Sequence, residues 1–245
     1  MARHLIQGRD VSMPVRVRDA AVCSASYLVR ADAARAVLAY SGLDAAEVLP
    51  GRALCTLAFV DYADGDLDAY HEFGVAFMIR PPEAGPPPRR GLRANLAELR
   101  RSGAGFFVHW LPVDQGFTLE AGRTIWGFPK EPADIDLRLA SPYKRCVVRK
   151  DGRLVVDLLV RPGFRVPVPA SATPFDAYSH LDGVTRRIPW SVSPSGVRTR
   201  PGGALIRLGN HPVARELSEL GLPKRALMTL TVDHTAMAFG EAKAL

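Results

Sequence analysis

Short strand-like runs separated by turn signals dominate this sequence, and they constrain its fold more than any other feature. The clearest pair is 144–150 and 153–160, joined by Asp151-Gly152, a dipeptide typical of two-residue β-hairpin turns. Asp64-Gly65 is a second hairpin signal. Further strand-like runs occupy 20–29, 53–62, 68–79, 104–113, 134–140, 185–193, 204–208 and 225–239. Together these runs predict an antiparallel, mostly β fold.

Helical patterns are fewer, and about three helices are expected in this α+β, mostly β chain. The candidate segments are 32–40 with Asp32 as its cap, the amphipathic 92–101, 118–126, and 211–220 between an Asn210 cap and a Gly221 stop. Two proline-containing stretches, 81–88 and 164–175, read as loops. A length of 245 residues fits one large domain, and no shift in composition marks a boundary. We therefore expect a single domain over 1–245.

Composition and charge exclude several classes of function. The sequence starts without an apolar signal-peptide core, and no apolar run approaches the roughly 18 residues of a membrane span. These features predict a cytoplasmic protein without a membrane partner. The net charge of +7 comes from scattered arginines, and no basic helix or aromatic-and-basic pattern accompanies it. We therefore expect no nucleic-acid partner.

Metal and disulfide chemistry are also not expected. The cysteines, Cys23, Cys55 and Cys146, are odd in number and widely spaced in apolar runs, which is typical of buried thiols. His71-Glu72 lacks a second histidine at metal-binding spacing. The alternating aspartates of 64–68 lack the closing glutamate of a calcium loop and read as a polar turn. No metal and no cofactor are predicted.

Residues 122–131 (GRTIWGFPKE) contain the candidate nucleophile. They place Lys130 at the end of an apolar run, directly after Pro129 and near Trp126 and Phe128. Apolar surroundings favour the neutral amine over the ammonium form, and a neutral amine attacks ketones to give imines. The same pattern also fits a loop lysine whose stem packs on the aromatics while its charge stays in water.

The order of several motifs resembles the acetoacetate decarboxylase family. Gly122-Arg123 followed by Pro129-Lys130 is similar to the family's lysine motif, in which an aromatic residue and a proline precede the imine-forming lysine. Residues 70–74 (YHEFG) are similar to the family segment that carries an active-site glutamate, here Glu72. His109 falls in the family's strand at the same distance before the lysine, and the tail 208–239 resembles the closing helix and strand. The likeness runs in order from residue 22 to 239.

This resemblance implies both a fold and a set of site residues. The fold is a cone-like antiparallel β-barrel with flanking strands and about three helices, which encloses an apolar pocket and assembles into homo-oligomers. The implied catalytic residues are Lys130 as the nucleophile and Glu72 as the group that transfers protons. The implied pocket residues are His109, Trp126, Phe128, Phe73 and, as the nearest counterpart of the family's N-terminal arginine, Arg18.

The chain departs from the family pattern at three points. Glu131 stands where the family has a second lysine, so burial must supply most of the activation of Lys130. In an extended backbone Glu131 would point away from Lys130. The family's other glutamate falls within 55–57, none of which is acidic, and its N-terminal arginine falls at residues 21–22.

Three functions remain open on the sequence alone. The first is an imine-forming lyase that decarboxylates a small β-keto acid such as acetoacetate. The second is an imine-forming aldolase-dehydratase or cyclase that uses an α-keto acid such as pyruvate, whose imine loses a methyl proton instead of CO2. The third is a noncatalytic barrel that binds a small acid. A small keto acid is the expected partner in both enzymatic cases.

Overall fold

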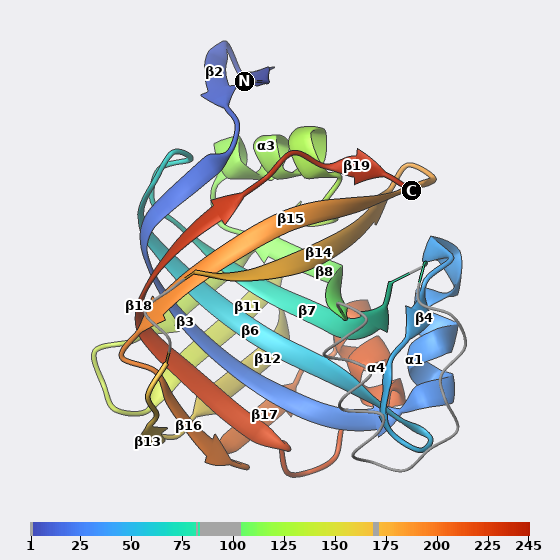
Figure 1. Ribbon diagram of the computed structural model, residues 1–245. Helices are drawn as coiled ribbons and strands as arrows, with labels where there is room; N and C mark the ends of the chain where they lie inside the picture. The colour runs from blue at the N-terminus through green and yellow to red at the C-terminus, as the bar shows by residue number, and fades with distance from the viewer. Residues whose placement is uncertain (1, 82, 84–103, 169–171) are drawn as a thin grey trace.

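The computed structural model describes residues 2–81, 83, 104–168 and 172–245, and its centre is a closed β-barrel (Figure 1). The predicted helix at 92–101 lies outside these residues, as does most of the expected loop at 81–88. The barrel strands follow the order β18-β3-β6-β7-β8-β14-β15, and β15 pairs with β18 to close the ring. Their bounds are β3 Val15–Arg30, β6 Arg52–Gly65, β7 Tyr70–Arg80, β8 Gly105–Val113, β14 Thr173–Leu181, β15 Val184–Ser195 and β18 Met228–Phe239. The mostly β prediction is confirmed.

One junction of the barrel departs from the antiparallel expectation. β14 pairs in parallel with β8 through Ala177 and Tyr178, whereas its other neighbour, β15, is antiparallel over nine residue pairs. The sequence places β14 partly inside a predicted loop because it contains Pro174. Pro174 pairs only with β15, before β14 reaches β8, so its missing N–H leaves the second ladder intact.

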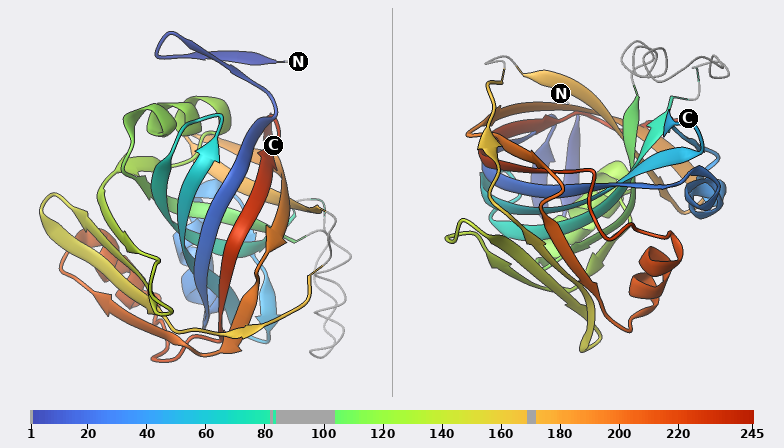
Figure 2. Two further views of the ribbon diagram at one scale, coloured as in Figure 1. Left: turned by 90° about the vertical axis from the view of Figure 1, so that its left-hand side faces the viewer. Right: turned by 90° about the horizontal axis from the view of Figure 1, so that it is seen from below.

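A second, four-stranded sheet packs against the outside of the barrel (Figure 2). It has the order β10-β11-β12-β17, with bounds β10 Asp134–Arg138, β11 Lys144–Lys150, β12 Arg153–Val160 and β17 Ala204–Leu208. The β11–β12 hairpin has the bounds that its turn predicts, because Asp151 and Gly152 adopt φ values of 51° and 70°. Leu158 of this sheet and Leu57 of the barrel are fully buried in the same core.

Three α-helices flank these sheets in the described part of the chain. They are α1 Ala31–Leu38, which continues into the short 3-10 helix η1 Ala39–Ser41, α3 Gly116–Trp126 and α4 Pro212–Glu219. The cap of α4 is His211, whose Nδ1 accepts from the N–H of Val213 at 3.3 Å, and not the predicted Asn210. No helix among the described residues is long and apolar enough to cross a membrane.

Short strands complete the molecule. They are β1 Arg3–Ile6, β2 Arg9–Ser12, β4 Asp44–Ala45, β5 Glu47–Leu49, β9 Lys130–Pro132, β13 Phe164–Arg165, β16 Arg198–Pro201 and β19 Lys243–Ala244. β1 and β2 form an N-terminal hairpin at the same end of the barrel as α3 (Figure 1). All three cysteines are unpaired and buried, as predicted.

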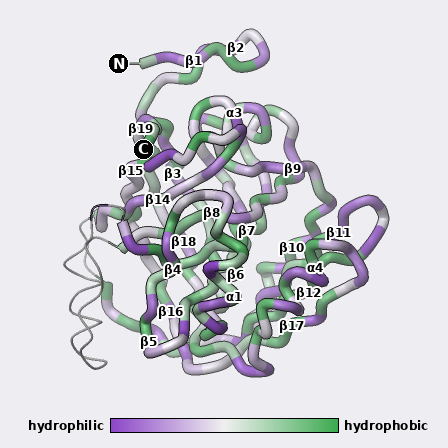
Figure 3. The backbone as a smooth tube through the Cα atoms, turned by 90° about the vertical axis from the view of Figure 1, so that its right-hand side faces the viewer, coloured by the Kyte–Doolittle hydropathy of each residue, from purple (hydrophilic) through white to green (hydrophobic). Residues whose placement is uncertain are grey.

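The barrel strands alternate between two buried surfaces. Side chains at odd positions of β6, such as Leu57 and Phe59, point outward into the core shared with the second sheet. Those at even positions, such as Ala58 and Val60, point into the barrel and line a cavity. Figure 3 colours the backbone by hydropathy and shows hydrophobic and hydrophilic residues interspersed along it.

Candidate active site

Lys130 enters the barrel from the short strand that follows α3. Gly127, with φ 63°, ends the helix, and its N–H donates to the carbonyl of Arg123 at 3.0 Å. The chain then runs parallel to β8, with Lys130 opposite Leu111. Ser179 Oγ of β14 donates to the carbonyl of Trp126 at 2.6 Å and anchors the end of the helix. These contacts fix the backbone from which the lysine side chain extends.

The ammonium group of Lys130 is buried against a small set of polar partners. Its Nζ lies 2.8 Å from Oε2 of Glu72 and donates to Oγ1 of Thr118 at 3.0 Å. It also lies 4.9 Å from the centre of the Tyr70 ring. Lys130 is 3% exposed, so its charge is compensated by Glu72 and not by water.

Two stacked tyrosines complete the surroundings of Glu72. The hydroxyl of Tyr62 donates to Oε1 of Glu72 at 3.1 Å, and the rings of Tyr62 and Tyr70 stack with centres 4.2 Å apart. Burial, followed by the negative charge of Glu72, raises the pKa of both phenols well above the ordinary value. Both tyrosines therefore keep their protons at neutral pH, and Tyr62 remains a donor to the carboxylate.

A cavity of about 440 Å³ opens from Lys130 into the barrel. Three charged side chains line it among the described residues, namely Asp68, Glu72 and Lys130, and all lie at the end where β6 turns into β7. Trp126 and Phe128 form part of the wall beside the lysine, as the sequence predicts. The remainder is mainly aliphatic and aromatic, with Phe106, Val108, Val192, Leu230 and Val232 among its members. The site therefore combines one buried amine, one carboxylate and a large apolar space.

A comparison with known protein families assigns the chain to a family. The family model described as acetoacetate decarboxylase (ADC) matches residues 7–242. The chain belongs to the acetoacetate decarboxylase family. A comparison with curated proteins gives no significant match.

Solved structures of acetoacetate decarboxylase share the fold. One, described as structural studies of acetoacetate decarboxylase, is similar with a TM-score of 0.68 and 16% identity over 96% of this chain and 90% of that one. The acetoacetate decarboxylase from Legionella pneumophila has a TM-score of 0.66 and 16% identity, covering 96% of this chain and 88% of its own. The enduracididine biosynthesis enzyme MppR in complex with pyruvate gives 0.62 and 18%, covering 96% and 91%. At these identities the likeness concerns the fold.

Two residues that the family resemblance assigns to the pocket lie on the opposite face of their strands. Phe73 follows Glu72 directly, so strand alternation turns it outward, where its ring packs against Trp110 with centres 6.1 Å apart. His109 likewise follows Val108, which lines the cavity. The Nε2 of His109 lies 2.6 Å from Oε1 of Glu216, in the interface with α4.

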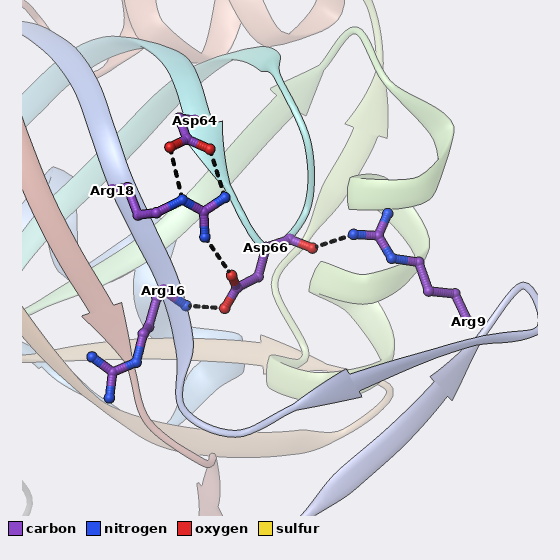
Figure 4. Close-up of polar contacts among 5 residues, drawn as sticks. All are labelled: Arg9, Arg16, Arg18, Asp64 and Asp66. Atoms are coloured by element: carbon purple, nitrogen blue, oxygen red, sulfur yellow. Dashed lines mark hydrogen bonds and ion pairs between the residues drawn. The ribbon is translucent and has the colours of Figure 1, made fainter.

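Arg18 also lies outside the cavity lining, on the surface of the barrel (Figure 4). Its guanidinium donates to both carboxylate oxygens of Asp64, at 2.7 and 2.5 Å, and to Oδ1 of Asp66 at 2.8 Å. Asp66 accepts as well from the backbone N–H of Arg16 at 2.8 Å. Arg18 thus fastens β3 to the polar turn between β6 and β7, and it contributes no charge to the pocket.

Glu131 points away from the cavity, as an extended backbone requires. It is paired with Lys150 of β11 and accepts from Nε1 of Trp110 at 3.0 Å. Burial opposes its ionisation, but the hydrogen bonds from Lys150 and Trp110 outweigh burial and hold the pKa of Glu131 below its ordinary value. The carboxylate that replaces the family's second lysine therefore acts between the two sheets and does not face Lys130.

Thr118, Tyr62, Tyr70 and Gly122 contact or shape the lysine site, although the sequence does not single them out for that role. Tyr70 and Gly122 lie inside the motifs at 70–74 and 122–131, but the sequence does not indicate their contacts with Lys130. Thr118 precedes the lysine by about two turns of helix and a bend, and no sequence pattern indicates that contact. Within the described ranges, no cluster of three or more metal-binding side chains occurs.

Proposed function

We propose that this protein is an imine-forming lyase that decarboxylates a β-keto acid with Lys130 as the nucleophile. The observation that carries the proposal is the position of that amine: Nζ of Lys130 is buried 2.8 Å from Oε2 of Glu72 at the end of a large apolar cavity. A carboxylate at this distance is within reach to accept the ammonium proton and free the amine. The family membership supports the same chemistry.

The proposed reaction follows from these two groups. The amine of Lys130 adds to the ketone carbon, and Glu72 returns the proton to the hydroxyl group that leaves as water. The protonated imine then accepts the electron pair of the bond to the carboxylate, so that CO2 departs and an enamine remains. Glu72 then takes up one proton from solvent and delivers it to the enamine carbon, and water releases the ketone product and the free lysine. Proton transfer of this kind contributes about 10²–10⁴ in rate.

The charge balance of the cavity favours decarboxylation over a reaction of pyruvate. Decarboxylation consumes the substrate carboxylate, and both products, CO2 and the enamine, are uncharged. Pyruvate would instead keep its carboxylate throughout the reaction. The described cavity lining includes no arginine or histidine, so only Lys130 would offer that carboxylate a positive charge. An aldolase-dehydratase acting on pyruvate remains the second candidate because the fold is shared with MppR in complex with pyruvate.

Borohydride trapping tests the proposal. Acetoacetate and borohydride should leave a reduced adduct on the peptide that carries Lys130, with release of CO2, and the Lys130→Met variant should give neither. Glu72→Gln should form CO2 at least about 100-fold more slowly. An adduct with pyruvate and no CO2 from any β-keto acid would favour the aldolase reading. Absence of any adduct would leave the noncatalytic binding protein as the remaining function, and full activity in Lys130→Met would rule out Lys130 as the nucleophile.

Assembly into a homo-oligomer stays a prediction, and sedimentation velocity would test it.

A further inference from the structure

We infer that the substrate is a β-keto acid with a long apolar tail, which lies along the barrel interior while its keto-acid head reaches Lys130. This inference rests on the proposed function and names the substrate class of the same site. Its basis is the cavity, whose 440 Å³ falls in the range of roughly 300–1,000 Å³ typical of sites for drug-sized ligands. Acetoacetate would occupy only the charged end and leave an apolar space beyond it.

The cavity extends far from the lysine along β6 and β7. Its lining includes Tyr62 and Tyr70, which pair with each other beside the lysine, and also Thr56 and Ala76, which pair with each other further along. Six residues separate the two levels, and a strand advances about 3.3 Å per residue, so the lining spans roughly 20 Å. An extended chain advances about 3.5 Å for every three covalent bonds, so a tail of eight carbons is roughly 9 Å long.

Small side chains create the room in the middle of the barrel. Ser24, Ala58 and Gly74 lie in one row across β3, β6 and β7, with Ala58 paired to both of the others, and all three line the cavity. Ala58 is partly accessible although it faces the barrel interior, because the cavity lies in front of it. A larger side chain at this row would divide the cavity into a reacting end and an empty end.

The distribution of charge gives the ligand an orientation. Every ionisable side chain among the described lining residues, apart from the two tyrosines beside Glu72, belongs to the Asp68, Glu72 and Lys130 end. Beyond it the wall is made by apolar side chains such as Trp190, Phe106 and Leu230, with a few hydroxyl groups. A polar head therefore fits at Lys130, and the apolar tail fits along the remaining length. Each buried methylene adds a factor of about four in affinity.

A chain-length series tests this inference. The wild-type protein should decarboxylate 3-oxodecanoate with a kcat/KM at least about 100-fold above that for acetoacetate, given the factor of about four per methylene. The rate with benzoylacetate, which carries an aryl group, shows whether the site accepts an aryl tail in place of an alkyl tail. Ala58→Phe should lower the ratio of kcat/KM for 3-oxodecanoate to that for acetoacetate by at least about 30-fold, whereas Ala63→Phe, exposed on the same strand, should keep the wild-type ratio. Equal use of acetoacetate and 3-oxodecanoate by the wild type would overturn the inference.

A binding measurement separates the tail from the imine chemistry. Lys130→Met cannot form an imine, and Trp126 and Trp190 in the cavity wall report occupancy through their fluorescence. This variant should bind 2-nonanone at least about 100-fold more tightly than acetone. Equal affinity for the two ketones would overturn the tail site. Tight binding of 2-nonanone would support the tail site even if the wild type gave no borohydride adduct, whereas the missing adduct would contradict the proposed imine reaction.

Discussion

Gly122 of α3 lies against the side chain of Lys130 so closely that no β-carbon fits between them. A Cβ at Gly122 would stand 2.5 Å from Cδ and 2.6 Å from Cε of Lys130. Since both groups are buried, the lysine has no room to yield without moving its Nζ away from Glu72. The glycine of the lysine motif therefore makes space for the side chain of Lys130, the proposed nucleophile.

The Gly122→Ala variant should consequently lose at least about tenfold in the rate of imine formation and about 1–3 kcal/mol of unfolding free energy, because the added methyl overpacks the site. Borohydride trapping and urea denaturation measure the two effects. Gly116→Ala is the matched control on the same helix, since a β-carbon there meets no atom within 4 Å. Wild-type trapping rates in Gly122→Ala would contradict this account of the motif.

The hydroxyl of Thr118 holds the amine of Lys130 in place. Thr118→Val keeps the side-chain volume but removes the oxygen that accepts from Nζ at 3.0 Å. A lost hydrogen bond to a charged group costs about 1.5–3 kcal/mol, so the trapping rate should fall by roughly 10–100-fold. Thr118→Ser, which retains the hydroxyl, should recover most of the rate. Equal rates for the valine and serine variants would show that the hydroxyl is not needed.

Glu131 should matter for stability and not for chemistry. Glu131→Gln weakens the pair with Lys150 between β9 and β11, and a partly exposed pair of this kind contributes up to about 1 kcal/mol. The trapping rate with acetoacetate should remain that of the wild type. Glu131→Lys should not raise it, even though this change restores the residue type of the family, because the side chain at 131 points away from the cavity. A faster Glu131→Lys enzyme would refute this placement.

The contact between His109 and Glu216 predicts a stability effect that depends on pH. The hydrogen bond from His109 lowers the pKa of Glu216, and burial opposes the shift. A carboxyl group with a lowered folded-state pKa stabilises the protein above its unfolded pKa of about 4.3, and that stability is lost as the pH falls through the lowered value. Glu216→Gln should therefore unfold at a lower temperature at neutral pH, by an amount worth less than about 1 kcal/mol because the pair is half-exposed.

Thermal unfolding at neutral pH and in strong acid measures this difference, which should shrink in acid as Glu216 of the wild type takes up its proton. Trapping of acetoacetate by Glu216→Gln should match the wild type, since His109 lies outside the cavity lining. A large loss of trapping in this variant would return His109 to the reacting site.

Local sequence signals predict the strands well, but not how the barrel closes. The Asp151-Gly152 turn sets the bounds of its hairpin because positive φ at both residues brings Lys150 opposite Arg153, although the register shifts further along, between Val148 and Arg149. The parallel contact between β8 and β14 depends on residues about 70 positions apart, for which a single sequence offers no pairing signal. The prolines of the 164–175 stretch predict a loop there, so the start of β14 at Thr173 is not predicted.

In the site, too, local sequence predicts some side-chain orientations, whereas others depend on strands that are distant in the sequence. Strand alternation is enough to turn Phe73 away from Glu72 and Glu131 away from Lys130. It leaves open which face of β8 lines the cavity, and so whether His109 or Val108 points inward, because that depends on partners from other strands. A bulge between Val75 and Ala76 shifts the pairing of β7 with β8 as well. The contact between Thr118 and Lys130 depends on how the chain turns back after α3, which no local sequence pattern indicates.

The proposed nucleophile and the row of small side chains in the cavity come from separate parts of the chain. Lys130 is carried by the unit of α3 and β9, whereas the row of small side chains belongs to β3, β6 and β7. Exchanges of alanine, serine or glycine in that row alter the space without touching the helix and turn that hold the lysine. The architecture therefore allows mutation and selection to retune which substrate is accepted while the reacting group stays the same, a modular route by which one scaffold can diversify.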